Sequence, residues 1–354
     1  MLSDGSLDPE KAMTTTPIHS IGGRTGLART AIKLVAVAGL IPLIALNEVP
    51  GHAEDAYPSR GMQMIVPFSP GGATDILARL IADRFRDKWG QAVVVENRVG
   101  ASGNVGANFV AKAAPDGYTL LMGAIGTNAV NVVLFETMPY DTANDFAPVV
   151  QVASFPMLLV VHPSVPAKSL PELMALAKDK PGELNHGSAG KGASQHLAAL
   201  LFESMTGARL QHIFYRGAAA MLPDLLSGRI QLSFGDMASI LPSVKSGELR
   251  AIAVTTSKRS RLLPDVPTLD EAGLKGYDAS AWYGVFAPAR TSPAIVDRLN
   301  AEVASALKTE QMTGRLEQLG GDPVGSTPAA FKAFVQGEMT RWSDVIRKAG
   351  IKPE

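Results

Sequence analysis

The sequence of 354 residues contains no cysteine. Without cysteine, the chain can form no disulfide, build no thiolate metal site and carry no lipid on a cysteine side chain. Export of a large protein of this composition favours a bacterial periplasm over a small secreted scaffold, because such scaffolds depend on disulfides.

The sequence also lacks an excess of charge of either sign, since 33 Lys and Arg residues balance 33 Asp and Glu residues. Zero net charge gives no electrostatic reason to expect a nucleic-acid partner. The six histidines include no pair at the spacing of a zinc site. We therefore expect neither a metal nor another cofactor.

Long apolar runs are missing too. The run from Leu34 to Leu46 is shorter than the roughly 20 residues that a transmembrane helix needs. Gly51 and Ala53 supply the small residues of a signal-peptidase site. A basic flank precedes the run, formed by Arg24, Arg29 and Lys33. We expect residues 1–53 to be a signal peptide that directs a periplasmic protein; an N-terminal anchor is the alternative.

A proline and glycine turn connects a strand-like segment to an amphipathic helix at Ile65 to Asp75. Gly71 and Gly72 have no Cβ, so the backbone is free in conformation and a ligand can approach the main-chain N–H groups. These groups are the unpaired donors of a helix start, where the helix dipole adds positive charge. Apolar residues mark the helix at three- and four-residue spacing: Ile76, Leu77, Leu80, Ile81, Phe85 and Trp89. The turn therefore predicts an anion site.

The segment Ser188 to Ser194 repeats this pattern. Small residues free its backbone, and an amphipathic helix with Leu197, Leu200 and Leu201 follows. Two helix starts facing one cleft would bind one anion better than either alone.

Strands and helices alternate from Tyr57 onward, which is typical of a parallel sheet with helices on both faces. Roughly 300 mature residues exceed what one core usually supports, which favours two domains. We expect a discontinuous first domain over 54–157 and 260–354, with 158–259 inserted as the second. Expected strands include Met62 to Phe68, Thr119 to Gly123, Leu158 to Val161, Ile230 to Phe234, Ala251 to Val254 and Trp282 to Ala287.

Six sequence blocks in this order resemble the Bug family of periplasmic solute-binding proteins of tripartite tricarboxylate transporters. The blocks are VPFSPGGATDILAR, VVVENRVGASGNVGA, AAPDGYTLLMG, LNHGSAGKGASQHLAALLF, RAIAVTTSKRSRLLPDVPTLDEAGL and WYGVFAPARTSPAIVDRLNAEV. The resemblance implies an α/β fold of the periplasmic binding protein type II, with two doubly wound α/β domains around a ligand cleft. It also implies a small carboxylate ligand and delivery to membrane permease subunits, and we expect a monomer.

The resemblance also implies which residues bind the ligand. From the first domain these are Phe68, Ser69, Gly71, Gly72, Ala73, Thr74, Asp75, Gly126, Thr127 and Asn128. From the second domain they are Ser188, Ala189, Gly190, Gly192, Ser194 and Asp236. The chain departs from the family in two places: His186 stands where Tyr is frequent, and Tyr215 to Ala220 lacks a common proline.

Several of these residues also have a purely structural interpretation. Asp75 stabilises a helix in its first turn with or without a ligand. His196 is interpreted first as a structural imidazole, and His162, His186 and His212 likewise, because their spacing does not suit a metal. Trp282 and Tyr283 are expected in the core.

Enzyme motifs fail at key positions. Asn104 stands where a nucleophile elbow needs glycine, and Gln195 stands where a dinucleotide loop needs its third glycine. In a phosphate loop, Asn185 would occupy the leading glycine position and Gly192 the Ser or Thr position. We therefore expect no catalytic residue. An exported hydrolase or isomerase acting on a carboxylate is the alternative, and a ligand-binding sensor is a third hypothesis.

Overall fold

Ten strands form one connected sheet in the computed structural model, which describes residues 57–215 and 217–353. The predicted signal peptide and Arg216 lie outside these residues. The strand order is β2-β1-β3-β9-β4-β7-β5-β6, with β8 and β10 also paired to β4. The strands nearer the chain ends are β1 (Met62–Val66), β2 (Val93–Asn97), β3 (Thr119–Ala124), β9 (Ser280–Pro288) and β10 (Asp322–Pro323). The others are β4 (Phe146–Val161), β5 (Asn185–Ser188), β6 (Gln211–Phe214), β7 (Leu232–Asp236) and β8 (Arg250–Val254).

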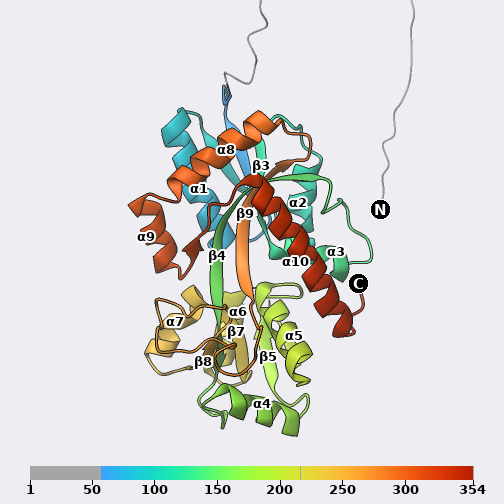
Figure 1. Cartoon of the computed structure of the whole chain (residues 1–354), viewed down its shortest axis with the longest axis vertical. Helices are drawn as coiled ribbons and strands as arrows, with labels where there is room; N and C mark the ends of the chain where they lie inside the picture. The colour runs from blue at the N-terminus through green and yellow to red at the C-terminus, as the bar shows by residue number, and fades with distance from the viewer. Residues whose placement is uncertain (1–56, 216, 354) are drawn as a thin grey trace, which may run out of the picture. The chain divides into compact units, whose positions relative to one another are not determined.

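Strand β4 belongs to both halves of this sheet, and it runs with β9 through the middle of Figure 1. It pairs with β9 up to Pro156 and with β7 from Met157 onward. The described residues belong to one compact unit. Below, the first lobe means the β1, β2, β3, β9 half and the second lobe the β5, β6, β7, β8 half.

The sheet is mixed: the predicted parallel pairing is present in each lobe, and antiparallel pairs join the two lobes. Strands β1, β2 and β3 pair in parallel, as do β5, β6 and β7. Strand β9 is antiparallel to both β3 and β4, and β4 is antiparallel to β7. The antiparallel pairs arise because β4 and β9 cross between the lobes in opposite directions.

The predicted strand Leu158 to Val161 is only the end of β4. Proline hides the rest of the strand from a sequence pattern, because proline cannot donate to a strand ladder. Pro148 lies at a register irregularity, and Pro156 lies where β4 changes partner.

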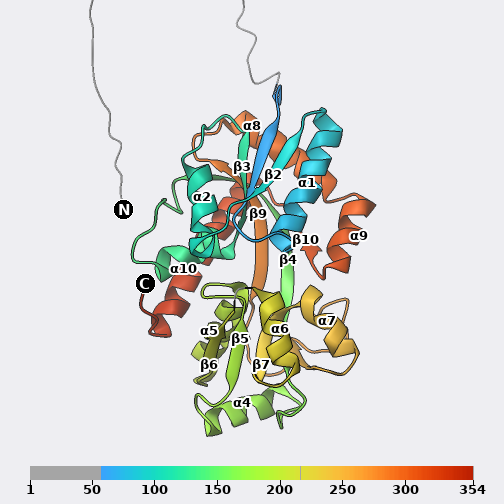
Figure 2. The ribbon, with the colours of Figure 1, turned by 180° about the vertical axis from the view of Figure 1, so that it is seen from behind.

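Helices cover both faces of each lobe (Figures 1 and 2). In the first lobe, α1 (Ala73–Trp89), α8 (Pro293–Ala306) and α9 (Glu310–Gln318) share one hydrophobic core. On the other face are α2 (Asn104–Ala111), α3 (Asn131–Leu134) and α10 (Pro328–Lys348). In the second lobe, α4 (Leu170–Asp179) and α5 (Ser194–Thr206) cover one face, and α6 (Ala218–Leu226) and α7 (Met237–Lys245) the other.

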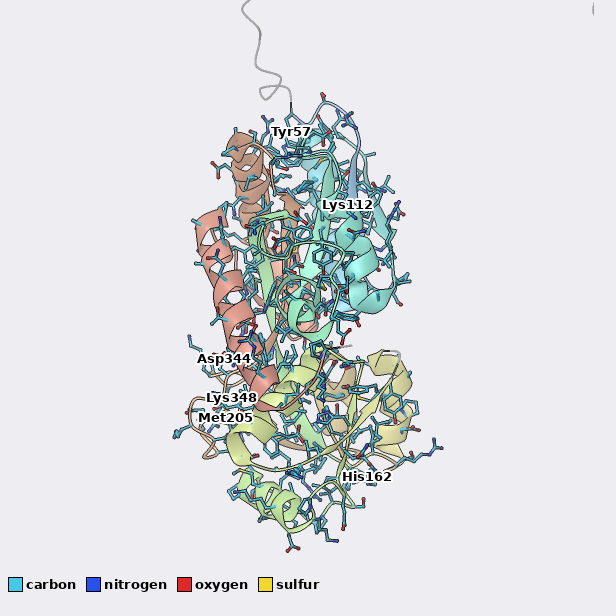
Figure 3. All side chains as sticks on the ribbon, turned by 90° about the vertical axis from the view of Figure 1, so that its right-hand side faces the viewer. Tyr57, Lys112, His162, Met205, Asp344 and Lys348 are labelled. Carbon is cyan, nitrogen blue, oxygen red and sulfur yellow. The ribbon has the colours of Figure 1, made fainter. Side chains whose placement is uncertain are left out.

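One hydrophobic core continues from the first lobe into the second. It contains Trp282 and Phe331 of the first lobe together with Phe202 and Phe234 of the second. Helix α10 contacts α5, and Figure 3 labels Asp344 and Lys348 on α10 close to Met205 on α5. No helix within the described part of the chain is long and apolar enough to span a bilayer.

Candidate functional site

The first glycine turn leads from β1 into α1. Gly71 has a φ of +85°, a conformation that favours glycine. Gly72 is the N-cap of α1, and no side chain caps this helix start. The first-turn N–H groups therefore face an exposed turn without an intrahelical acceptor, as the sequence predicted for an anion site.

Asp75 holds this turn in shape. It is 3% exposed, and its Oδ2 accepts hydrogen bonds from the Gly71 N–H (3.0 Å) and from Arg79 Nε (3.1 Å). Its Oδ1 accepts from Arg79 Nη2 (2.9 Å) and Asn97 Nδ2 (3.0 Å), and Asn97 also donates to the Phe68 carbonyl (2.9 Å). Burial alone raises the pKa of Asp75, but these hydrogen bonds outweigh it and hold the pKa below its ordinary value. Both carboxylate oxygens are thus engaged by the turn itself, and ligand contact by Asp75 stays a prediction.

A short π-helical turn, η2 (Gly126–Val130), follows β3. Thr127 and Asn128 are buried there, and Thr127 Oγ1 lies 2.7 Å from Asn128 Oδ1. The Tyr140 hydroxyl lies 2.8 Å from the Thr127 carbonyl oxygen. Asn128 Nδ2 is buried and has no hydrogen-bond partner among residues 57–215 and 217–353. A buried amide donor in this state calls for an explanation, because nearly all such groups are satisfied in folded proteins.

The second glycine loop leads from β5 into α5. Gly190 and Gly192 have φ values of +142° and +76°, and Ala193 at the N-cap of α5 provides no side-chain cap. The Gly192 N–H donates to His196 Nδ1 (3.1 Å), so His196 has a structural role in shaping the loop. Ser188 is fully buried, and its hydroxyl donates to the Gly190 carbonyl (3.4 Å).

The second glycine loop and the turn after β3 touch each other. A Cβ on Gly126 would lie 3.6 Å from the carbonyl oxygen of Gly192. A Cβ on Gly192 would lie 2.8 Å from Leu134 Cδ1 and 3.5 Å from Asn131 Oδ1. Predicted site residues from both lobes are thus close together, although they are 66 positions apart in sequence.

Asp236 ends β7 beside the start of α5. Its Oδ2 accepts a hydrogen bond from Gln195 Nε2 (2.7 Å). Burial raises the pKa of Asp236 to about 6, and the Gln195 hydrogen bond opposes the rise. Burial also raises the pKa of Tyr283, with a further contribution from the charge of Asp236. Tyr283 lies on β9 opposite Ala124, so it connects Asp236 to the end of β3.

Three histidine rings meet behind the second loop. His186 lies 5.3 Å from His212, and His196 lies 5.1 Å from His212, measured between ring centroids. His212 Nε2 is 2.8 Å from Glu203 Oε2. Within the described residues, no group of three or more His, Asp or Glu side chains is arranged to hold a metal.

Sequence reasoning missed four residues that organise the site: Asn97, Asn131, Gln195 and Tyr283. Gln195 and Asn97 are simple amides with no motif of their own. Tyr283 was expected in the core, and it does pack against the core of the first lobe, but it is only partly buried and its pKa is also raised by the charge of Asp236. Their positions become visible only when distant segments pair. Trp282, in contrast, is fully buried as expected, and its indole N–H donates to Glu338 (3.0 Å).

Two α/β lobes that share crossing strands, each with an uncapped helix start, define a solute-binding protein of the periplasmic type. The family model described as "Tripartite tricarboxylate transporter family receptor" matches residues 77–351. The chain belongs to this family of tripartite tricarboxylate transporter receptors, whose Bug members include periplasmic binding proteins.

Individual relatives agree with this membership. The chain is 39% identical to Protein BugT of Bordetella pertussis over 321 residues, which cover 90% of this chain and 98% of BugT. A solved structure described as R. palustris Rpa4515 with adipate has 41% identity and a TM-score of 0.77, with 84% of this chain and all of that chain covered. MatC from Rhodopseudomonas palustris with bound malate has 35% identity and a TM-score of 0.73, covering 82% and 100%. These relatives are binding proteins or receptors rather than enzymes.

Proposed function

We propose that the protein captures a small organic carboxylate between its lobes and presents it to the permease subunits of a tripartite tricarboxylate transporter. Residues 1–53 would direct its export, and it would act as a monomer without catalytic turnover. The two lobes would be the predicted domains 54–157 with 260–354, and 158–259. The observation that carries the proposal is the pair of uncapped helix starts, one in each lobe.

Energetics require more than the helix dipoles. Each dipole contributes about 0.3 to 1 kcal/mol, whereas micromolar binding needs about 8 kcal/mol. Hydrogen bonds to a charged group contribute about 1.5 to 3 kcal/mol each. The first-turn N–H groups of α1 and α5 would supply several such donors. Relatives solved with adipate and with malate support a carboxylate as the ligand class.

A glycine substitution tests the first turn. Gly72 has an ordinary φ of −79°, and a Cβ there would meet nothing closer than 3.9 Å. Gly72→Val should therefore fold normally while its side chain shields the first-turn amides of α1. We expect the melting-temperature increase caused by a bound carboxylate to disappear, since that increase reports binding to the native state.

The matched control is Gly314→Val, in an open position of α9. This variant should keep the full ligand-induced increase. A Gly72→Val protein that binds as well as the wild type would show that the first turn does not hold the ligand. Steady conversion of any bound carboxylate would show that the protein is an enzyme instead.

A further inference from the structure

The two acidic residues of the predicted site, Asp75 and Asp236, differ in how many of their carboxylate oxygens accept hydrogen bonds from the protein. Asp75 has hydrogen bonds on both oxygens, all from its own turn or from neighbouring Arg79 and Asn97. Asp236 uses only Oδ2, for Gln195. Its Oδ1 accepts no hydrogen bond from any residue in the described part of the chain. Within residues 57–215 and 217–353, the second lobe therefore has one carboxylate oxygen of Asp236 that is not used by the protein itself.

This oxygen stands at the edge where a ligand would be bound. Strands β5 and β7 are parallel neighbours, so the loops after Ser188 and Asp236 leave the sheet at the same edge. Gln195 fixes the carboxylate next to the start of α5. The charge of Asp236 contributes to the raised pKa of Tyr283 on β9 of the first lobe, and Tyr283 pairs in register with Ala124 at the end of β3.

We propose that Asp236 selects the ligand by accepting a hydrogen bond from a donor group at the end remote from the first glycine turn. This inference rests on the proposed function, because it assumes that the first turn holds a carboxylate. The ligand class becomes a carboxylate with a hydroxyl or ammonium group at its far end. A fully ionised dicarboxylate is disfavoured, because its second carboxylate would face a like charge.

Protonation of Asp236 gives a second signature. Its pKa of about 6 makes it an ionised acceptor above that pH and a donor below it. The ionisable group that couples to it within the described residues is Tyr283, whose own pKa is raised, and α5 contributes the uncharged Gln195. The ratio of the affinity for a donor-bearing ligand to that for a dicarboxylate should therefore be largest above about pH 6, and it should fall as the pH decreases below that value.

The test compares ligands of equal chain length by titration calorimetry. The probes are a linear dicarboxylate, the hydroxy monocarboxylate with the hydroxyl at the far end, and the corresponding amino acid. At about pH 7.5 we expect the wild type to bind one of the two donor-bearing ligands at least about tenfold more tightly than the dicarboxylate, as for one charged hydrogen bond. Asp236→Asn keeps an oxygen for Gln195 and turns an N–H donor toward the ligand, so the preference should invert. Asp83→Asn, the same change in an exposed ion pair of α1, should leave it unaltered.

Each outcome decides one statement. If the dicarboxylate binds more tightly and Asp236→Asn leaves the ratio unchanged, the selecting role is wrong while carboxylate capture stands. If no carboxylate binds to the wild type, the proposed function itself fails. Should Asp236→Asn not fold, the wild type alone is decisive: a preference that stays constant between about pH 7.5 and pH 5 overturns the proposal.

Discussion

At the scale of single residues, the site depends on which polar atoms already have a hydrogen-bond partner within the protein. Asp75 and Asp236 occupy similar positions in the sequence, since each lies near the start of a helix that comes after a strand. In the structure, both carboxylate oxygens of Asp75 accept hydrogen bonds, whereas Asp236 accepts one on Oδ2 alone within the described residues. The first residue therefore shapes the anion site, and the second is suited to touch the ligand.

Removal of the Asp75 side chain should disturb the first turn. Asp75→Ala leaves the Gly71 N–H and Asn97 Nδ2 without this acceptor, so we expect the free energy of unfolding to fall by about 1 to 3 kcal/mol. Ligand affinity should fall as well, because the turn loses its anchor. Urea unfolding and calorimetric titration measure the two effects.

The control for this variant is Arg79→Ala. It removes an ion pair whose arginine side chain is 51% exposed but leaves the Gly71 and Asn97 hydrogen bonds in place. Its effect should stay below about 1 kcal/mol, as for exposed ion pairs. Equal losses in the two variants would contradict the anchoring role of Asp75.

At the scale of elements, β5, α5 and β6 bring three histidines together behind the second loop. Neither ring nitrogen of His186 has a hydrogen-bond partner within the described residues. Burial, helped by His212 and His196, lowers the pKa of His186 well below its ordinary value. Burial, with His212 and Lys191, lowers the pKa of His196 to about 3. His186 and His196 are therefore neutral imidazoles in the native protein near neutral pH.

These pKa shifts predict acid sensitivity. In the unfolded chain a histidine takes up a proton near pH 6.5, whereas His186 and His196 resist it in the native state. The stabilisation is complete above about pH 6.5 and is lost as the pH falls toward 3, by up to about 1.4 kcal/mol per pH unit for each histidine. His186→Phe should flatten this loss between about pH 6.5 and pH 5, as measured by urea unfolding.

The comparison for this variant is His162→Phe. His162 hydrogen-bonds with Ser164 and lies outside the group of three histidines. If the free energy of unfolding falls equally steeply with pH in the wild type and in His186→Phe, the prediction for His186 is wrong.

At the scale of the whole molecule, β4 and the shared core make the two lobes one unit. Strand β4 pairs with first-lobe strands at one end and with second-lobe strands at the other. One hydrophobic core contains residues of both lobes. Neither lobe can lose its packing without exposing apolar surface of the other, which favours cooperative unfolding.

A single unfolding transition is the expected result. The three tryptophans, Trp89, Trp282 and Trp342, all lie on first-lobe elements, and two of them belong to the shared core, so fluorescence reports the first lobe and that core. Far-UV circular dichroism reports both lobes. Their urea midpoints should coincide without ligand; a fluorescence midpoint separated from the dichroism midpoint would show that the lobes unfold independently.

Local features of the chain were readable from the sequence alone. The glycine turns at Gly71 and Gly190, the helices after them and the family blocks depend on neighbouring residues, so their signals survive in one dimension. The alternation of strands and helices indicated the parallel pairs, but it does not specify the direction of β9 or the length of β4, so the antiparallel pairs were not predicted.

The tertiary structure alone decided which polar atoms of the site are free. Gln195 reaches Asp236 across 41 positions, and Asn97 reaches Asp75 across 22. No local pattern encodes such pairs. The first exists only after the fold has placed α5 beside β7, and the second only after it has placed β2 beside α1. The sequence therefore determined the two glycine turns at which we propose that an anion is held, and the packing of distant segments determined which carboxylate oxygens accept hydrogen bonds from the protein itself.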